Sequence, residues 1–184
     1  WYIDWLGVRG VNMFVPHAFY YSIVGNRKDE RPPDVGPNNI WWKHYRWFSD
    51  YIKRISYIMT DSVNCAKTAI LCSSGNMNTA EEFYETQTEF NYLPYSMLYN
   101  AQVKDGKLCI GGYEYEYVLG ETELDVNKIK SIADVKKRDF YTDFPQKDLR
   151  VSHIVKYGVH MYFIVNEGEK DIDTYAEMTV KGTP

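Results

Sequence analysis

The sequence has few cysteines, no long apolar runs and no excess of positive charge. Its three cysteines, Cys65, Cys72 and Cys109, are odd in number and lie in apolar segments, which indicates reduced core thiols rather than disulfides or a metal site. Free thiols lean toward a cytoplasmic location, although the compartment itself stays open. No run is long enough to predict a membrane span. The net charge of -4, without a basic stripe, argues against a nucleic-acid partner.

Aromatic residues are the unusual component, at 16% of the 184 residues, with 17 Tyr and 5 Trp. Rings with a polar edge suit carbohydrate, because its C–H faces stack on the ring while its hydroxyls take hydrogen bonds. Half-buried tyrosines at sheet edges are the alternative explanation, and composition alone favours it.

The first residues predict a helix at 1–9 followed by a buried parallel strand at 11–15. The run from Val11 to Val15 is apolar on both faces, as in a parallel strand covered by helices. Ligand-recognising groups lie just past the carboxyl ends of such strands. Trp1 and Tyr2 favour burial, so we expect the chain to be a fragment of a longer protein.

Five residues around this strand are candidates for binding a sugar: Asn12, His17, Tyr20, Tyr21 and Trp41. The His17 imidazole can donate a hydrogen bond to a sugar hydroxyl. A purely structural role for His17 at the end of the strand is an equally favoured alternative. Hydrogen bonds to backbone suit Asn12 better than a ligand role. The tyrosines follow the strand, and Trp41 comes just after a long loop at 25–39 that is typical of a lid or binding loop.

The middle of the chain has the pattern of alternating strands and helices. The expected elements are a helix at 41–60, a strand at 66–72, a helix from a capping box at 78–81 to about 90, a strand at 90–93, a helical turn at 95–100, a hairpin at 102–110, a strand at 113–119 and a helix at 125–135. The acidic residues Glu81, Glu82, Glu85 and Glu89 are predicted to form a solvated helix face.

The tail changes to β patterns after a polar linker at 136–139. Strands are expected at 149–155, 159–165 and 174–180, with a turn at Tyr157-Gly158, which together form a three-stranded antiparallel meander. His153 and His160 are predicted to be ordinary sheet residues, because no two histidines have the sequence spacing of metal ligands.

Several of these segments resemble a known family. The segments 9–20, 29–38 (Asp-Glu-Arg-Pro-Pro-Asp-Val-Gly-Pro-Asn) and 41–45 (Trp-Trp-Lys-His-Tyr) resemble the end of the catalytic barrel in large bacterial glycoside hydrolases related to the β-galactosidase clan and the rhamnosidases. The segments 89–93, 105–108 and 111–115 look like a flavodoxin-like (glutamine-amidotransferase-like) domain. The segments 148–151 and 163–169 look like the opening of a β-sandwich.

The resemblance implies an α/β chain of three parts. These are the last βα piece of a TIM barrel at 1–60, a flavodoxin-like (glutamine-amidotransferase-like) domain at 61–135, and the start of a β-sandwich, an antiparallel β meander, at 136–184. The segment from Gly120 to Lys147 is short for a complete flavodoxin-like domain. The implied function is a fragment of a glycoside hydrolase that acts on a plant or bacterial glycan.

In such relatives the catalytic carboxylates lie on earlier barrel strands, so the resemblance implies that they are outside this chain. We therefore expect no catalytic residue, no metal and no cofactor here, a carbohydrate partner, and neither nucleic acid nor membrane. The flavodoxin-like part is a candidate contact between copies of the chain. A non-catalytic carbohydrate-binding or subunit-contact module is the alternative. A nucleotide or flavin binder is disfavoured, because GxGxxG and a Walker lysine are absent.

Overall fold

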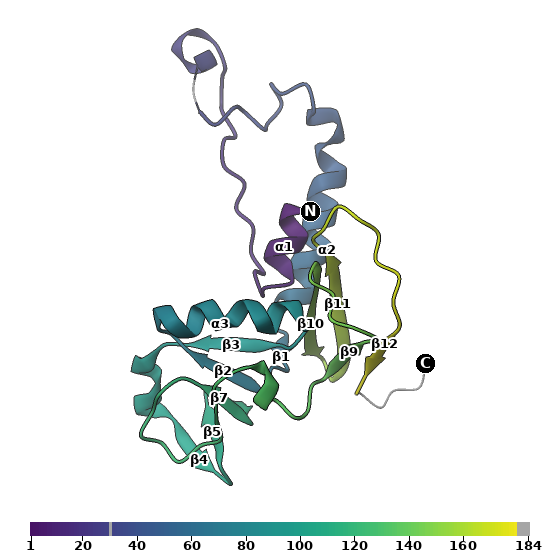
Figure 1. Cartoon of the computed structure of the whole chain (residues 1–184). Coiled ribbons are helices and arrows are strands. Elements are labelled where there is room, and N and C mark those ends of the chain that lie inside the picture. Colours follow the sequence, from purple (N-terminus) through teal and green to yellow (C-terminus); the bar gives the residue numbers. More distant parts are fainter. Residues whose placement is uncertain (30, 180–184) are drawn as a thin grey trace. The chain divides into compact units, whose positions relative to one another are not determined.

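The computed structural model describes residues 1–29 and 31–179 and divides into two compact units (Figure 1). Unit 1 is Trp1–Ser62 and unit 2 is Val63–Pro184. Among the described residues, no helix combines the length and apolar character needed to cross a membrane.

Unit 1 is built on two helices, α1 (Tyr2–Gly7) and α2 (Tyr45–Met59), with short 3-10 helices η1 (Gly25–Asp29) and η2 (Trp42–His44). The predicted helices at 1–9 and 41–60 are confirmed by α1 and by η2 with α2. The apolar spacing of α2 buries Ile55 and Met59. The Tyr51 hydroxyl donates to Asp4 of α1, which joins the two helices.

The predicted strand at 11–15 is wrong. These residues have no regular secondary structure, and Met13 and Val15 are 75% and 83% exposed. A strand exists only where a neighbour takes its backbone hydrogen bonds, and no strand in the described part of the chain pairs with this segment. Its apolar side chains therefore remain on the surface of unit 1.

The long loop that follows is organised by Asp34. Its buried carboxylate accepts hydrogen bonds from the backbone N–H of Tyr20 at 2.9 Å and of Gly36 at 3.0 Å. The bond from Tyr20 is the main reason that the pKa of Asp34 is lowered. A backbone bond from Val35 to Ala18 of 2.8 Å closes the same loop.

Unit 2 contains a parallel sheet in the order β3-β2-β7-β8. Its strands are β2 (Thr68–Leu71), β3 (Phe90–Leu93), β7 (Tyr117–Leu119) and β8 (Lys128–Ile129). Helix α3 (Ser74–Glu85) connects β2 to β3. The predicted strands at 66–72 and 90–93 are confirmed by β2 and β3.

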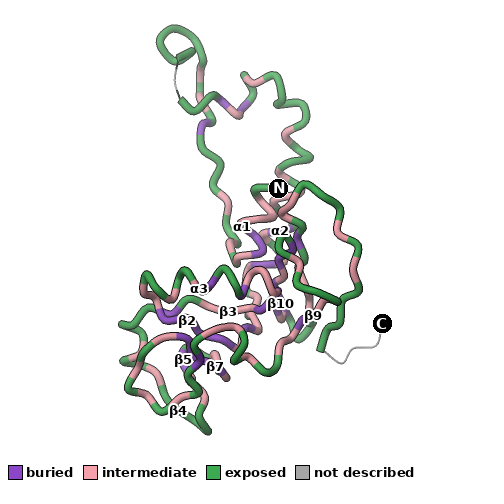
Figure 2. The backbone as a smooth tube through the Cα atoms, viewed as in Figure 1, coloured by how far each residue is buried: buried purple, intermediate pink, exposed green. Residues whose placement is uncertain are grey.

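The sheet is covered on both faces, which explains why every residue of β2 is buried (Figure 2). Ile70 and Leu119 pack with Phe83 of α3 on one face. Ala69 and Leu71 pack with Leu108 on the other face, against a second sheet. The core of unit 2 therefore lies on either side of β2.

The second sheet, β4-β5-β6, is antiparallel and follows the 3-10 helix η3 (Tyr95–Asn100). It consists of β4 (Gln102–Lys104), β5 (Lys107–Ile110) and β6 (Tyr113–Tyr115). The predicted turn at 95–100 and the hairpin at 102–110 are confirmed. The hairpin turn has positive φ at both Asp105 (+51°) and Gly106 (+73°), as a two-residue turn with this chemistry requires.

Three predictions in this region are wrong. The strand at 113–119 is two strands, β6 and β7, in different sheets. The helix at 125–135 is replaced by β8 and the 3-10 helix η4 (Ile132–Asp134), because β8 pairs with β7. Helix α3 begins before the predicted capping box, since the Ser73 hydroxyl caps it by accepting from the Asn76 N–H at 3.3 Å.

The tail forms two further antiparallel pairings. The predicted hairpin is confirmed by β10 (Leu149–Lys156) and β11 (Val159–Asn166), and β1 (Val63–Asn64) pairs with the other side of β10. The three-stranded meander is wrong, because β12 (Ala176–Met178) pairs with β9 (Phe140–Thr142) instead of β11. Residue 180, at the end of the predicted strand, lies outside the described residues.

Candidate functional site

The predicted sugar-binding residues all lie in unit 1. Asn12, His17, Tyr21 and Trp41 are exposed, and Tyr20 is half-buried. Tyr20 is fixed at two points: its backbone N–H donates to Asp34, and its hydroxyl donates to the carbonyl of Pro32 at 2.5 Å. None of the five lines either of the two hollows in unit 2 described below.

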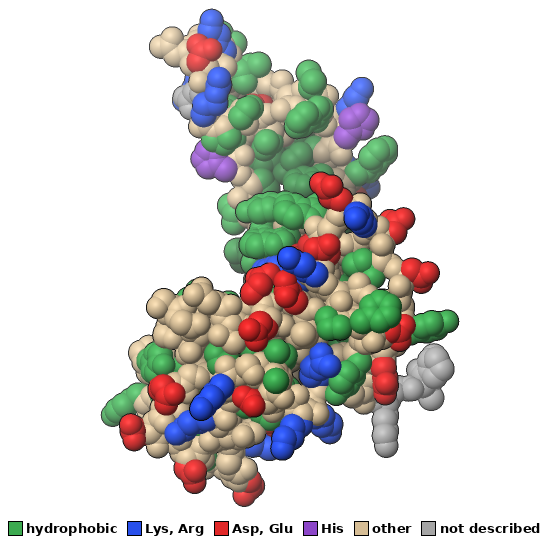
Figure 3. Space-filling view, in the orientation of Figure 1, with side chains coloured by type: hydrophobic (Ala, Val, Ile, Leu, Met, Phe, Trp, Pro, Cys, Tyr) green, Lys and Arg blue, Asp and Glu red, His purple; other side chains and the backbone are tan. Residues whose placement is uncertain are grey.

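Aromatic rings beside these residues form a packed group. Trp42 stacks on Tyr45 with ring centroids 5.2 Å apart, and Phe19 meets Tyr45 edge-on at 5.5 Å. Phe48 continues the group along α2. Hydrophobic side chains are also prominent on the surface of unit 1 in the space-filling view (Figure 3). Sequence reasoning singled out Trp41, whereas Trp42 is the ring that packs the loop onto the helix.

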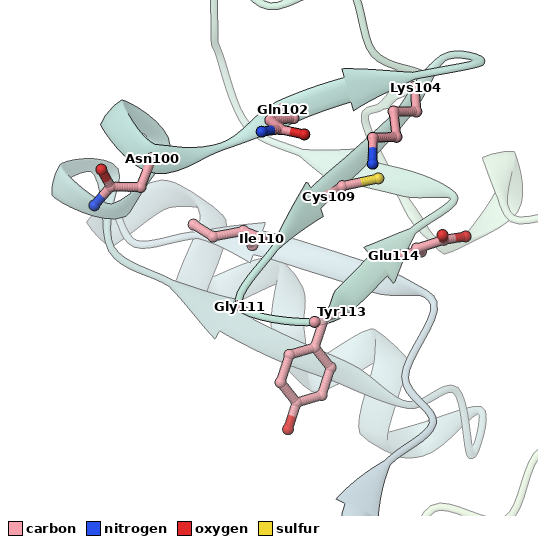
Figure 4. A pocket seen from close by; sticks show the side chains of 9 residues that line it. Asn100, Gln102, Lys104, Cys109, Ile110, Gly111, Tyr113 and Glu114 are labelled. Atoms are coloured by element: carbon pink, nitrogen blue, oxygen red, sulfur yellow. The ribbon is translucent and has the colours of Figure 1, made fainter.

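One hollow in unit 2 has a volume of about 310 Å³ and lies on the β4-β5-β6 sheet (Figure 4). The strand register places Gln102, Cys109 and Glu114 side by side on three neighbouring strands. Lys107 pairs with Glu114 at 3.4 Å. The volume is at the lower end for small-molecule sites, and the polar lining suits hydroxyl groups.

A polar cluster surrounds His153 in the interior of unit 2. Its Nδ1 bonds to the carboxylate of Asp139, and its Nε2 lies 2.8 Å from Nδ1 of His160. The ring stacks on Tyr162 with centroids 4.2 Å apart. Burial opposes ionisation of Asp139, but hydrogen bonds from His153 and Thr179 outweigh it and lower its pKa.

The cluster also contains Glu89, whose carboxylate accepts from Nδ2 of Asn64 at 2.8 Å. Burial raises the pKa of Glu89 to about 7, although the backbone N–H of His153 and the Asn64 amide partly oppose the rise. The prediction that Glu89 belongs to a solvated helix face is wrong, because α3 ends at Glu85 and the chain then turns inward toward β3.

Glu89 and Asp139 have some features of a catalytic carboxylate pair. One oxygen of each lies within 4.8 Å of the other, and the two pKa values are shifted in opposite directions. However, the hollow beside them has a volume of only about 20 Å³, enough for about one water molecule and far too small for a sugar ring. The pair is therefore enclosed in the fold and does not flank a glycosidic bond.

Cys65 completes the cluster from the end of β1. Its Sγ and one ring nitrogen each from His153 and His160 lie within 4.8 Å of one another. Burial, together with the carboxylates of Glu89 and Asp139, raises the pKa of the Cys65 thiol to about 11. The thiol is protonated at neutral pH, so it is not an activated nucleophile.

Sequence reasoning missed this cluster because its members come from five separate segments. The one available signal was the spacing of His153 and His160 about the two-residue turn at Tyr157-Gly158. That spacing places both imidazoles on one face of the hairpin, since residues 153 and 162 are paired and residue 160 is next to 162 on the same face.

Comparison with known proteins gives one partial similarity. Over 124 residues the chain is 24% identical to a protein of Formosa agariphila named "Putative beta-glucuronidase". The match covers 62% of this chain and 11% of that protein, so the chain spans about a tenth of the relative's length. No family model matches the chain, and no solved structure gives a significant match. At a coarse level, the chain is thus similar to part of a glycoside hydrolase.

Proposed function

We propose that the chain is part of a glycoside hydrolase acting on a plant or bacterial glycan, with β-linked glucuronic acid as the first sugar to test. The observation that carries the proposal is the similarity over 124 residues to a protein named as a beta-glucuronidase. In this proposal unit 1 contributes to the edge of the substrate cleft through His17, Tyr20, Tyr21, Asn12 and Trp41. The catalytic carboxylates belong to parts of the protein outside these residues.

The exposure of these side chains supports the proposed role. Tyr21 and Trp41 are 103% and 72% exposed, so their rings are free to stack on the C–H face of a sugar. The hydrogen bonds that Tyr20 donates to Asp34 and to the Pro32 carbonyl hold it in place, which reduces the entropy lost when a ligand binds.

We also propose that the parallel sheet of unit 2 is a reduced flavodoxin-like fold with an accessory role. The order β3-β2-β7-β8 supports this, since it reads 2-1-3-4 when the strands are numbered along the chain, as in the first four strands of flavodoxin. One departure is that the β4-β5-β6 sheet, in place of a helix, connects β3 to β7.

Hydrolysis of aryl glycosides tests the enzymatic proposal. The full-length parent protein and the 184-residue chain are each assayed with 4-nitrophenyl β-D-glucuronide and with the corresponding β-galactoside. We expect the parent to cleave the glucuronide and the isolated chain to be inactive. If neither the parent nor the 184-residue chain cleaves either substrate, the proposal is overturned in favour of a non-catalytic carbohydrate-binding or subunit-contact module.

His17→Ala in the parent tests the proposed cleft edge. We expect catalytic efficiency to fall by more than about tenfold, which corresponds to roughly 1.4 kcal/mol. His44→Ala is the matched control, because His44 is also an exposed histidine of unit 1 and lies in η2. Equal kinetics for the His17 variant and the unmodified parent would remove His17 from the site.

A further inference from the structure

We propose that Cys65, His153 and His160 bind a divalent transition-metal ion, with Zn²⁺ as the best match. Their three donor atoms already lie within 4.8 Å of one another. Thiolate and imidazole are the ligands that Zn²⁺ takes most often in proteins, at about 2.3 Å and 2.0–2.1 Å. This site is separate from the proposed sugar-binding residues, which all lie in unit 1.

The sheet register brings the three ligands to one face. Val63 pairs with Val155 and Asn64 with Ile154, so the next position along, Cys65, is opposite His153. The backbone confirms this, because the Cys65 N–H donates to the His153 carbonyl at 2.9 Å. His160 reaches the same point from β11, where it is the diagonal neighbour of His153. All three backbone positions are therefore fixed by β-pairing.

Asp139 orients His153 for metal binding. Because its carboxylate accepts from Nδ1–H, the neutral ring carries its free lone pair on Nε2, the atom that faces His160. Metal-bound histidines almost always donate their other ring N–H to a carboxylate or carbonyl in this way. Thr179 in turn holds Asp139, through its hydroxyl and through a backbone bond of 3.1 Å.

Binding needs only small changes. Two nitrogens that share one Zn²⁺ lie about 3.3 Å apart in tetrahedral geometry, against the present 2.8 Å. The proton on Nδ1 of His160 moves to Nε2 by exchange with solvent, and the Cys65 thiol releases its proton as the metal–sulfur bond forms. His160 is exposed and Cys65 half-buried, so the ion has access from solvent and water can fill the fourth position.

The charges around the site favour a cation. Glu89 and Asp139 lie next to His153: one carboxylate oxygen of each is within 4.8 Å of a ring nitrogen of His153. Lys67 is a nearby opposing charge. A bound divalent ion would offset the two carboxylates and deprotonate the thiol, which is otherwise held protonated in this environment.

A titration of the 184-residue chain with Co²⁺, followed by absorbance, tests the site. We expect one equivalent of Co²⁺ to bind and to give a thiolate-to-cobalt charge-transfer band. Added Zn²⁺ should displace the bound Co²⁺ and remove the band. Cys65→Ser should abolish the band. His160→Gln should weaken binding by at least about 100-fold, and Asp139→Asn by about 10–100-fold, as for other outer-shell partners.

Cys72→Ser and His44→Gln are the matched controls, because neither residue belongs to the cluster, and both should bind Co²⁺ like the unmodified chain. Circular dichroism verifies that each variant is folded. If Cys65→Ser does not fold, the His160→Gln variant decides the question, because His160 is exposed and its replacement should leave the fold intact. The proposal is overturned by a charge-transfer band that persists in Cys65→Ser, by unchanged affinity in His160→Gln, or by the lack of stoichiometric binding to the unmodified chain.

Discussion

At the scale of single residues, Glu89 is the clearest case of a group whose surroundings change its chemistry. Its carboxyl is enclosed by Asn64 and the backbone of His153, and burial raises its pKa from an ordinary 4.5 to about 7. The folded chain therefore holds this proton more tightly than the unfolded chain does. The stability of the fold must then decrease as pH rises from about 4.5 to about 7, and stay at the lower level above that range.

We expect Glu89→Gln to remove this pH dependence, because the amide is neutral throughout. In the unmodified chain, the free energy of unfolding should fall by about 1–3 kcal/mol between pH 4.5 and pH 8 as Glu89 loses its proton. One pKa unit corresponds to about 1.4 kcal/mol. Urea unfolding at both pH values, with a chelator present, measures the difference. Glu82→Gln, on the exposed side of α3, is the control. A variant with the same pH slope as the unmodified chain would contradict the assignment.

At the scale of elements, the parallel sheet depends on a close approach between the end of β7 and the start of α3. Gly120 follows β7 with φ of +123°, and a Cβ there would lie 2.5 Å from Nδ2 of Asn76 and 2.9 Å from Cβ of Leu71. The Asn76 amide is itself held by the Leu71 carbonyl at 2.8 Å. The position therefore requires glycine for both its backbone conformation and its lack of a side chain.

We expect Gly120→Ala to destabilise unit 2 by about 3 kcal/mol or more, because it combines backbone strain with a steric clash. Gly106→Ala is the matched control: Gly106 also has positive φ, of +73°, but a Cβ there meets open space. The control should cost only about 1–2 kcal/mol. Chemical denaturation of both variants gives the comparison, and equal losses would show that the close approach is unimportant.

At the scale of the whole chain, burial is distributed unequally between the two units. The buried apolar side chains of unit 1 are Val8, Ala18, Ile55 and Met59, whereas unit 2 has two hydrophobic clusters around β2. Unit 1 also exposes several large apolar side chains, including Met13 and Val15. Large exposed apolar surfaces are typical of regions that contact another part of a protein or a ligand.

We therefore expect residues 63–184 to fold alone and residues 1–62 to require the rest of the protein. The isolated 63–184 segment should show a cooperative thermal transition near that of unit 2 in the full chain. The isolated 1–62 segment should melt gradually, because its few buried side chains cannot offset the entropy of ordering the chain. Thermal melts of the full chain, of 63–184 and of 1–62, followed by circular dichroism, provide the measurement. A sharp transition in the isolated 1–62 segment would contradict the prediction.

Local sequence patterns determined much of the secondary structure. The apolar spacing of α2 and the Asp105-Gly106 and Tyr157-Gly158 turns predict elements that the structure contains, because these signals act within a few residues. The apolar run of β2 likewise predicts a strand buried on both faces. A similar run at 11–15 does not form a strand, so hydrophobicity alone was insufficient there.

Only the tertiary structure decided which strands pair and which side chains meet. The pairings of β12 with β9 and of β1 with β10 join segments far apart in the chain. The first brings Thr179 to Asp139, and the second brings Cys65 opposite His153. No local pattern encodes such contacts, because they depend on hydrogen bonds between strands that are distant in sequence. The sequence alone therefore determined the elements with strong local signals, such as α2 and the two hairpin turns, and the three-dimensional strand pairing determined which of their side chains meet.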